Sequence, residues 1–544
     1  MLERELKLHV PTAAQAAVEQ ELQARGARTQ VLRALYFDTP GRELARARVA
    51  LRVRLEDGQW IQTLKMPGGD ALSRIELSHP RDEPTPDLAL YQERRLCKLF
   101  ANLREPLGLR YETYVERLLL RLRSRGSLVE LAYDRGVVGA AGHELPISEI
   151  EFELCAGTMD AVFALGKAWT RRHGLVLDMR SKAERGDLLA RAAAAANDAR
   201  QAGRQQGPGT AEQACATLAP ARKAEQPRLD AGMDLQQAAR ACVAECLDQI
   251  VRNATYAAGV DTGPAAPGLR AEYVHQLRVG IRRLRSCHKL FAGWMQPPAP
   301  RLESALRRGF LALGATRDAQ IVQREIAPRL RLAGMPADRA PGGTRRLEPD
   351  AAAALAASPE FQALLLDLMA REVPATTEAA EPAEPAGAPM DTGKARRQAA
   401  PAGDAGTARA SIEPPPEAGA ALARRLDKWL RQLVEPGQAF ATLTPAAQHA
   451  VRKKAKRLRY GLAFAAPYLD KPAQRRILAA LSAVQETLGE LNDLYVAERH
   501  YRGLAKARPQ VWFAVGWLRA MQHQQKEAAQ EAFAALAAAG RLKH

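Results

Sequence analysis

The sequence has few of the residues that build disulfide or zinc frameworks. Its six cysteines are spread over 544 residues, and none forms a Cys-x-x-Cys pair or a Cys/His set with the spacing of zinc ligands. Cys242 and Cys246 would share one face of a helix, where we interpret them as buried small side chains. This cysteine usage argues against a disulfide-stapled secreted domain and fits a reducing, cytoplasmic environment.

Aromatic residues and long apolar runs are also scarce. Phe, Trp and Tyr make up only 5% of the chain, which argues against a single-stranded nucleic-acid binder that works by base stacking. No stretch approaches the roughly 20 apolar residues of a membrane span, and the chain starts in charged residues rather than in a basic segment followed by an apolar one. We therefore expect a soluble, cytoplasmic protein without a membrane partner.

The length of the chain indicates how many domains it has, and its net charge indicates the charge of a binding partner. A chain of 544 residues exceeds what one hydrophobic core supports, so two or more domains are expected. Lys and Arg number 79 against 61 Asp and Glu, and the formal net charge is +18. Such an excess indicates a polyanionic partner, which could be a nucleic acid, an anionic membrane surface or a phosphate polymer.

The first residues of the chain alternate between charged and apolar side chains. Glu3, Glu5 and Lys7 have one parity, whereas Leu6 and Leu8 have the other. In a β-strand these two sets face opposite sides, so two carboxylates and an ammonium group would form one polar row. That row suits a metal ion held beside a polyanion. The alternative is an ordinary strand whose charged face is solvated.

Periodicity divides the chain into two regions of unlike pattern. Residues 1 to about 190 contain many short alternating segments, which predicts an antiparallel β-barrel or a strongly curved sheet. From residue 231 onward Leu, Ala, Arg and Gln dominate at helical spacing. The expected organisation is an α+β chain with a barrel domain at 1–195, a linker at 196–230 and a helical domain at 231–544.

The helical region contains an internal duplication. His275 is followed by a basic residue after three, seven and ten positions, and His449 is followed by basic residues at the same offsets. The two copies cover about 231–334 and 421–544. Between them, an Ala/Pro/Gly/Glu-rich insert at about 335–420 is expected to lack fixed structure.

Each copy places its basic residues on one helix face, because steps of three or four residues share a face. The first stripe is His275, Arg278, Arg282 and Arg285, and the second stripe is His449, Arg452, Lys456 and Arg459. Like charges stacked along a helix destabilise it, so their duplication favours neutralisation by an anion over a solvated face. The two histidines could donate to phosphate or support local packing.

The N-terminal row and the duplicated module resemble two known families. Glu3-x-Glu5-x-Lys7, followed by further charged strands, resembles the signature of the CYTH family of triphosphate tunnel enzymes. The repeated His and basic residues resemble a CHAD domain, a helical module associated with polyphosphate. The order CYTH then CHAD is similar to that of bacterial inorganic triphosphatases. The resemblance implies an antiparallel β-barrel, the triphosphate tunnel, followed by an all-α helical bundle with an internal duplication.

The resemblance also implies roles for individual residues. The catalytic tunnel cations would be Lys7, Arg52, Arg54, Lys65, Arg117 and Lys182. The candidate metal ligands are Glu3, Glu5, Glu130, Glu149, Glu151 and Glu153, and of the last three the favoured pair is Glu149 with Glu151. Arg74 and Glu76 match a further substrate-binding pair, and the two CHAD stripes would bind polyphosphate.

The chemistry of these residue types agrees with the resemblance. Triphosphate hydrolysis needs charge stabilisation, and clustered glutamates are hard ligands for Mg²⁺ or Mn²⁺. The expected function is metal-dependent hydrolysis of inorganic triphosphate to pyrophosphate and phosphate, with a C-terminal module that binds long-chain polyphosphate and could associate with polyphosphate granules. Alternatives are a class IV adenylyl cyclase, an organic (thiamine or nucleoside) triphosphatase, and a non-catalytic granule-binding protein. Nucleic-acid binding is a weaker interpretation, because it rests on charge alone.

Overall fold

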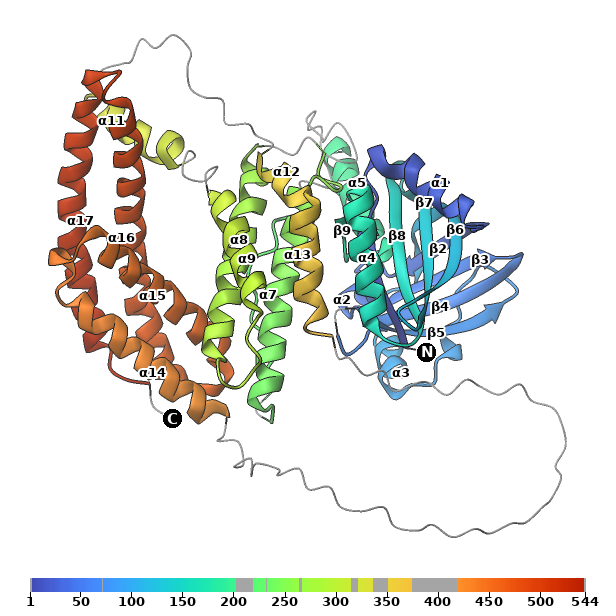
Figure 1. Cartoon of the computed structure of the whole chain (residues 1–544). Coiled ribbons are helices and arrows are strands. Elements are labelled where there is room, and N and C mark those ends of the chain that lie inside the picture. Colours follow the sequence, from blue (N-terminus) through green and yellow to red (C-terminus); the bar gives the residue numbers. More distant parts are fainter. Residues whose placement is uncertain are drawn as a thin grey trace, which may run out of the picture.

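The computed structural model consists of a β-barrel followed by a helical region (Figure 1). The barrel, coloured blue to cyan, lies at one end of the molecule, and the helices continue from green to red toward the other end. The structure describes residues 2–70, 72–201, 219–230, 232–263, 267–314, 321–335, 351–373 and 418–542.

Eight antiparallel strands close the barrel. They are β1 (Leu2–His9), β2 (Arg28–Asp38), β3 (Ala50–Glu56), β4 (Gln59–Pro67), β5 (Ser73–Arg81), β6 (Gly108–Ser124), β7 (Ser127–Ala140) and β8 (His143–Ala156). Their order is β5-β4-β3-β2-β6-β7-β8-β1, and β1 pairs with β5 through Glu3↔Arg74, which closes the cylinder. A two-residue strand, β9 (Val176–Leu177), adds to β1. The predicted antiparallel barrel is confirmed.

Tight hairpins and strand parity explain why these residues form a barrel. Asp57-Gly58, Arg125-Gly126 and Ala141-Gly142 have positive φ at both positions, as two-residue type I′ turns require, and each joins two consecutive strands. Outward-facing Leu6 and Phe152 are fully buried, because α1 (Gln15–Ala24) and α4 (Met159–His173) cover that side of the barrel. The inward-facing parity carries most of the charged residues and leaves a polar interior.

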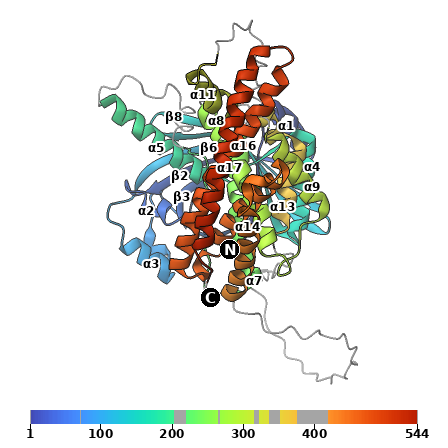
Figure 2. The ribbon, with the colours of Figure 1, turned by 90° about the vertical axis from the view of Figure 1, so that its left-hand side faces the viewer.

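The helical region is built largely from long helices. They are α7 (Leu235–Ala257), α8 (Pro267–Leu290), α9 (Pro300–Ala312), α11 (Ala327–Leu332), α12 (Ala351–Ala357), α13 (Pro359–Ala370), α14 (Ala418–Gly437), α15 (Pro445–Phe464), α16 (Lys471–Leu504) and α17 (Trp512–Ala538). The two predicted basic stripes lie on α8 and α15, which pack against each other. Figure 2 shows α16 and α17 running side by side. The predicted helical domain is confirmed as an architecture.

Further helices belong to the barrel region. They are α2 (Glu43–Arg46), α3 (Arg94–Ala101) and α5 (Lys182–Gln201), and a π-helical turn at Ile321–Ile326 leads into α11. Helix α5 reaches inside the linker predicted at 196–230. Residues 219–230 of that linker lie along α7, where Arg222 Nε contacts Asp248 at 2.9 Å. The rest of the predicted linker, at 202–218, lies outside the described residues.

The prediction of an insert without fixed structure at about 335–420 is wrong for residues 351–373. There α12 packs against α7 and α9, and α13 packs against α4 and β9, where Gln362 Oε1 accepts a hydrogen bond from the Leu177 backbone N–H at 2.8 Å. The Ala-rich composition conceals these helices, because their packing partners are distant in sequence. The positions 336–350 and 374–417 lie outside the described residues.

Within the described ranges, no individual helix combines the length and apolarity needed to cross a membrane. The α12–α13 pair, which is bent by 51°, is long and apolar enough only when the two helices are counted together. Most leucines of α13 are buried, so its apolar surface serves the contact between the barrel and the helices.

A buried ion cluster joins the barrel to the helical region. Asp261, in the turn after α7, accepts from Arg185 Nε and Nη2 at 2.7 and 2.9 Å and lies 3.1 Å from Arg180. Asp178 pairs with Arg180 at 2.7 Å. Burial disfavours the charged form of Asp261, but Arg185 and Arg180 outweigh burial and lower its pKa. Arg185 also lies 3.6 Å from Glu149, so the cluster continues into the barrel.

Replacing Asp261 with Asn should lower the free energy of unfolding by about 3 kcal/mol, because two buried guanidinium groups would lose the carboxylate that neutralises them. Chemical unfolding followed by circular dichroism measures the change. Asp82→Asn, at an exposed loop position, removes the same charge and should remain close to wild type. Wild-type stability of the Asp261→Asn protein would contradict the role assigned to the cluster.

Candidate active site

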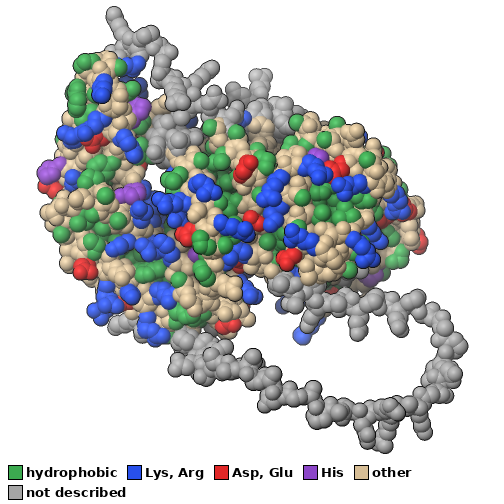
Figure 3. Space-filling model, viewed as in Figure 1, with side chains coloured by type: hydrophobic (Ala, Val, Ile, Leu, Met, Phe, Trp, Pro, Cys, Tyr) green, Lys and Arg blue, Asp and Glu red, His purple; other side chains and the backbone are tan. Residues whose placement is uncertain are grey.

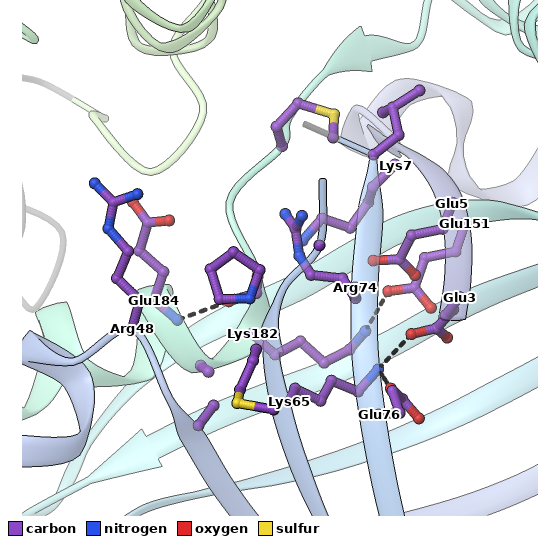
Figure 4. A pocket seen from close by; sticks show the side chains of 18 of the residues that line it. Glu3, Glu5, Lys7, Arg48, Lys65, Arg74, Glu76, Glu151, Lys182 and Glu184 are labelled. Atoms are coloured by element: carbon purple, nitrogen blue, oxygen red, sulfur yellow. Dashed lines mark hydrogen bonds and ion pairs between the residues drawn. The ribbon is translucent and has the colours of Figure 1, made fainter. Parts of the chain in front are cut away.

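The barrel interior brings the predicted tunnel residues together around one cavity of about 1590 Å³. Glu149 is the exception, because it is buried behind the cavity wall. The members that line the cavity come from seven strands and one helix: Glu3, Glu5 and Lys7 of β1, Arg52 and Arg54 of β3, Lys65 of β4, Arg74 and Glu76 of β5, Arg117 of β6, Glu130 of β7, Glu151 and Glu153 of β8, and Lys182 at the start of α5. Figure 4 shows lysine and glutamate side chains pointing toward one another across this space.

Lys182 is the centre of an ion network on one side of the cavity. Its Nζ lies 2.6 Å from both Asp134 and Glu149 and 3.1 Å from Glu151. Arg117 donates to both oxygens of Asp134 and, at 3.1 Å, to Glu151. Burial opposes the charge on Lys182, but the three carboxylates outweigh burial and raise its pKa well above the usual value. Burial also opposes the charge on Glu151, yet Lys182 and Arg117 hold its pKa far below the usual range.

Glu5 and Glu153 are in the opposite situation. They are cross-strand neighbours on β1 and β8, and Glu130 is the neighbour of Glu153 on β7. Burial, and then the charges of Glu151 and Glu3, raise the pKa of Glu5 to about 7. Burial, and then the charges of Glu3 and Glu130, raise the pKa of Glu153 to about 7. Burial and carboxylate repulsion together therefore outweigh the nearby lysines.

The wall formed by β3 and β4 is crowded with cations. Lys65 Nζ contacts Glu3 at 3.0 Å and forms an ion pair with Glu76. Burial and the charge of Arg52 nevertheless lower the pKa of Lys65, and the same two causes lower the pKa of Arg54 to about 10. The Nε atoms of Arg52 and Arg54 are buried and have no hydrogen-bond partner among the described residues. An anion at this wall would relieve the repulsion and accept the unused hydrogen bonds.

A second cationic site lies where α8 meets α15. Burial, and then the charges of Arg452 and Arg282, lower the pKa of Lys456 to about 7, so side chains from both predicted stripes converge. The Nε atoms of Arg282, Arg285 and Arg452 are buried without a hydrogen-bond partner in the described parts of the chain. In Figure 3, Lys and Arg side chains gather on this part of the surface, beside a hollow between the C-terminal helices and the middle of the molecule.

The remaining members of the two stripes take part in local contacts. Arg278 donates to the Leu313 carbonyl oxygen at 2.9 Å, and Arg459 donates to Gln485 Oε1 at 2.9 Å. His275 is half-buried, whereas His449 is exposed at the edge of its helix. These residues frame the convergence of α8 and α15 without lying at its centre.

Comparison with known families assigns the two regions. Residues 1–186 match the model of the CYTH domain, and residues 241–502 match the model of the CHAD domain. The chain carries a CYTH domain followed by a CHAD domain.

Part of the chain is similar to a named protein. Over 161 residues the chain is 33% identical to the inorganic triphosphatase of Haemophilus influenzae, a match that covers 28% of this chain and 44% of that protein. The match therefore spans less than half the length of this relative.

Solved structures are similar to each region. The CHAD domain of the plant Ricinus communis is 25% identical, with 60% of this chain and 98% of that chain covered and a TM-score of 0.43. An adenylyl cyclase candidate from Hippeastrum, described as having a dominant triphosphatase activity, is 19% identical, with 33% and 92% covered and a TM-score of 0.26.

One carboxylate set in the CYTH domain has the spacing of a metal site but is already neutralised. Oxygen atoms of Asp134, Glu149 and Glu151 all lie within 4.8 Å of one another. Lys182 contacts all three residues, and Arg117 contacts two of them. A divalent cation would have to displace these ammonium and guanidinium groups.

Glu3, Glu5 and Glu153 form a second carboxylate set, in which Lys65 contacts Glu3, but oxygen atoms of these three residues do not all lie within 4.8 Å of one another. Their mutual repulsion is what a cation would remove, and oxygen-only ligands suit Mg²⁺ or Mn²⁺. The sequence favours Glu149 with Glu151 as the late-strand ligands. Oxygen atoms of these two residues and of Asp134 lie within 4.8 Å of one another, but Glu149 is 2% exposed and held by Lys182 and Lys7, whereas Glu153 lines the cavity.

Sequence reasoning misses two residues of the CYTH site. Asp134 is fully buried in the Lys182 network, and its shared parity with Glu130 on β7 is the signal that could have identified it. Arg185 follows Lys182 by about one helical turn. Its main partner, Asp261, is in the helical region, so only the fold reveals the role of Arg185.

The raised pKa values of Glu5 and Glu153 predict how the metal-free protein responds to pH. Both rise from 4.5 to about 7 on folding, so between these pH values the folded state binds more protons than the unfolded state. The free energy of unfolding should therefore fall by about 2 kcal/mol for each of the two groups as the pH rises from about 5 to about 8 in the presence of a chelator.

Thermal unfolding at several pH values measures this dependence. Glu5→Gln and Glu153→Gln should each make the free energy of unfolding depend less on pH. Adding Mn²⁺ to the wild-type protein should recover the stability that it loses near pH 8. Glu83→Gln, at an exposed position, serves as the control and should leave the dependence unchanged. A wild-type pH dependence in both site variants would contradict the assignment.

Proposed function

We propose that the CYTH domain hydrolyses inorganic triphosphate to pyrophosphate and phosphate with the help of Mg²⁺ or Mn²⁺. The observation that carries this proposal is the division of one buried cavity into a cationic wall and a carboxylate cluster. A linear triphosphate needs cations along its length, and its hydrolysis needs stabilisation of the charge on the transferred phosphoryl oxygens.

The wall of β3 and β4 would bind the phosphate oxygens. Arg52 and Arg54 have unused Nε donors, and a guanidinium group can donate two parallel hydrogen bonds to one phosphate. Lys65 would exchange part of its contact with Glu3 and Glu76 for phosphate. Each of these contacts would gain strength because like-charge repulsion in the empty wall would be offset.

Arg117 and Lys182 would act differently, because both already bind carboxylates. They keep Glu151 and Asp134 ionised and fixed beside the cavity. Lys7, 3.6 Å from Glu149, would present its ammonium group between this network and the substrate. We assign these three cations to positioning the anionic side chains as well as to neutralising the substrate.

Glu3, Glu5 and Glu153 would hold the divalent cation. When bound, the cation supplies charge neutralisation for phosphate oxygens and a water molecule of lowered pKa. Glu5 and Glu153 would lose their protons on binding, since carboxylate ligands must be deprotonated and both pKa values lie near 7. Metal binding near neutral pH should thus release protons.

An inorganic substrate is favoured over an organic one. Tyr36, Phe37 and Tyr111 line the cavity, and the two tyrosines stack on each other with ring centroids 4.8 Å apart. Trp60 is not among the described residues that line the cavity. The lining therefore offers little aromatic surface for a nucleobase or a thiazole ring. The name of the Haemophilus influenzae relative, inorganic triphosphatase, supports the same substrate.

A substrate panel tests the proposed activity. With Mg²⁺ or Mn²⁺, kcat/KM for phosphate release should be higher for tripolyphosphate than for ATP or thiamine triphosphate. Glu5→Gln should lower kcat about a hundredfold, because it removes a metal ligand while preserving side-chain shape. Glu83→Gln should leave kcat unchanged.

The panel also separates the alternatives. ATP turnover equal to that of tripolyphosphate would contradict an inorganic substrate, and formation of cyclic AMP would favour an adenylyl cyclase. Failure to turn over any of these compounds would favour the non-catalytic alternative.

For the CHAD domain we propose binding of long-chain polyphosphate between α8 and α15. Arg282, Arg452 and Lys456 converge there, and buried Nε atoms without partners are ready donors for phosphate oxygens. Lys456, with a pKa lowered to about 7, would become fully charged beside a polyanion. Binding at neutral pH should thus take up protons.

Arg452→Ala/Lys456→Ala should weaken long-chain polyphosphate binding by the full-length protein at least about tenfold and reduce the salt-dependence slope by about one for each residue removed. Titration calorimetry at several salt concentrations measures both quantities. Lys471→Ala/Arg475→Ala, on the exposed start of α16, is the charge-matched control and should bind as wild type does. Equal affinities of the two double variants would count against the stripes.

A further inference from the structure

The cavity that holds the tunnel residues continues out of the barrel and onto the helical region. Its volume of about 1590 Å³ exceeds the roughly 300–1,000 Å³ of a pocket for one small ligand. Beyond the barrel, the wall of the cavity is formed by α7 and by residues of the segment 219–230. The barrel therefore opens onto a space that both regions of the chain enclose.

Three arginines line this outer space from three separate segments. Arg48 lies between α2 and β3, Arg228 lies in the segment 219–230, and Arg240 lies on α7. No hydrogen bond or ion pair within the described part of the chain engages any of these three side chains. In the view of Figure 4, Arg48 lies across the cavity from the glutamates of β1.

The carboxylates on the same wall are mostly engaged with other cations. Glu184 forms an ion pair with Arg252, and Asp248 lies 2.7 Å from Arg252 as well. Glu372 also lines the cavity and is the carboxylate that interacts with Arg240 through its charge, although burial raises the pKa of Glu372 and disfavours its ionised form. Positive charge at the opening is therefore not compensated by these residues, and it would attract an anion.

We propose that Arg48, Arg228 and Arg240 form an outer phosphate site for linear polyphosphate, which binds phosphate units beyond the three held in the barrel. The proposal rests on the proposed triphosphatase function, because the barrel is taken to hold one end of the chain. Each phosphate unit is negatively charged, and arginine pairs with phosphate oxygens through parallel N–H groups.

The site would make the helical region part of substrate selection. Arg228 precedes α7 and Arg240 lies on it, whereas Arg48 belongs to the barrel region. A triphosphate would fill only the barrel, but a longer chain could contact both regions at once. Longer chains should therefore bind more tightly than triphosphate at the tunnel itself, independently of the stripes on α8 and α15.

An inhibition assay with the full-length protein tests the site. Long-chain polyphosphate is added as a competitive inhibitor of tripolyphosphate hydrolysis, and its inhibition constant is measured. Arg228→Gln/Arg240→Gln should raise the inhibition constant about tenfold, with a clearly smaller change in KM for tripolyphosphate. Arg48→Gln should act in the same direction from the barrel side. An unchanged inhibition constant, or an equal loss for both anions, would overturn the outer site.

The control variant removes the same charge elsewhere. Arg94→Gln/Arg95→Gln, on the exposed start of α3 and outside the cavity lining, should change neither constant.

If wild type hydrolyses no triphosphate, the proposed function fails, and calorimetry then decides the outer site. Long-chain polyphosphate is titrated into protein carrying Arg452→Ala/Lys456→Ala, with and without the Arg228→Gln/Arg240→Gln substitutions. Weaker binding with the added substitutions would support the outer site, and unchanged binding would overturn it.

Discussion

Charge compensation inside a closed barrel is the constraint on which the rest of this protein depends. Buried charges are tolerated only when opposite charges or ligands neutralise them. Strand register decides where that happens: Arg117 faces Asp134 across β6 and β7, whereas Glu5 faces Glu153 across β1 and β8. Neighbouring side chains of opposite charge form ion pairs, whereas neighbouring side chains of like charge leave a charge that is not neutralised. The barrel thus contains a network of paired charges beside a cluster of carboxylates whose charges are not fully neutralised.

The helical region is coupled to this network rather than merely attached to it. Arg185 contacts Asp261 of the helical region and lies 3.6 Å from Glu149 of the barrel. The backbone of Leu177 is held by Gln362 of α13 and by Thr255 of α7. The segment that positions Lys182 is therefore held from both sides. A second domain that shares buried charges with the barrel can also share its opening, which is the physical basis for an outer phosphate site.

Local patterns predicted much of the candidate site but few of its partnerships. The alternation of Glu3, Glu5 and Lys7 predicted a strand with an inward polar row, because parity is a property of any extended chain. The choice of Glu149 with Glu151 over Glu153 was made without knowing which lysines reach each carboxylate, and that depends on the fold. Local patterns also missed α13, whose helix-forming residues are stabilised by contacts with α4 more than a hundred residues earlier.

By itself, the sequence determined the barrel strands, the duplicated basic helices and the set of charged residues that face inward. These features follow from spacing along the chain, which local geometry converts directly into faces. Only the tertiary structure decided which carboxylates are neutralised by cations and which remain available for a metal. It also decided that the barrel opens toward α7. Both outcomes depend on distances between segments remote in sequence, where burial amplifies every unbalanced charge.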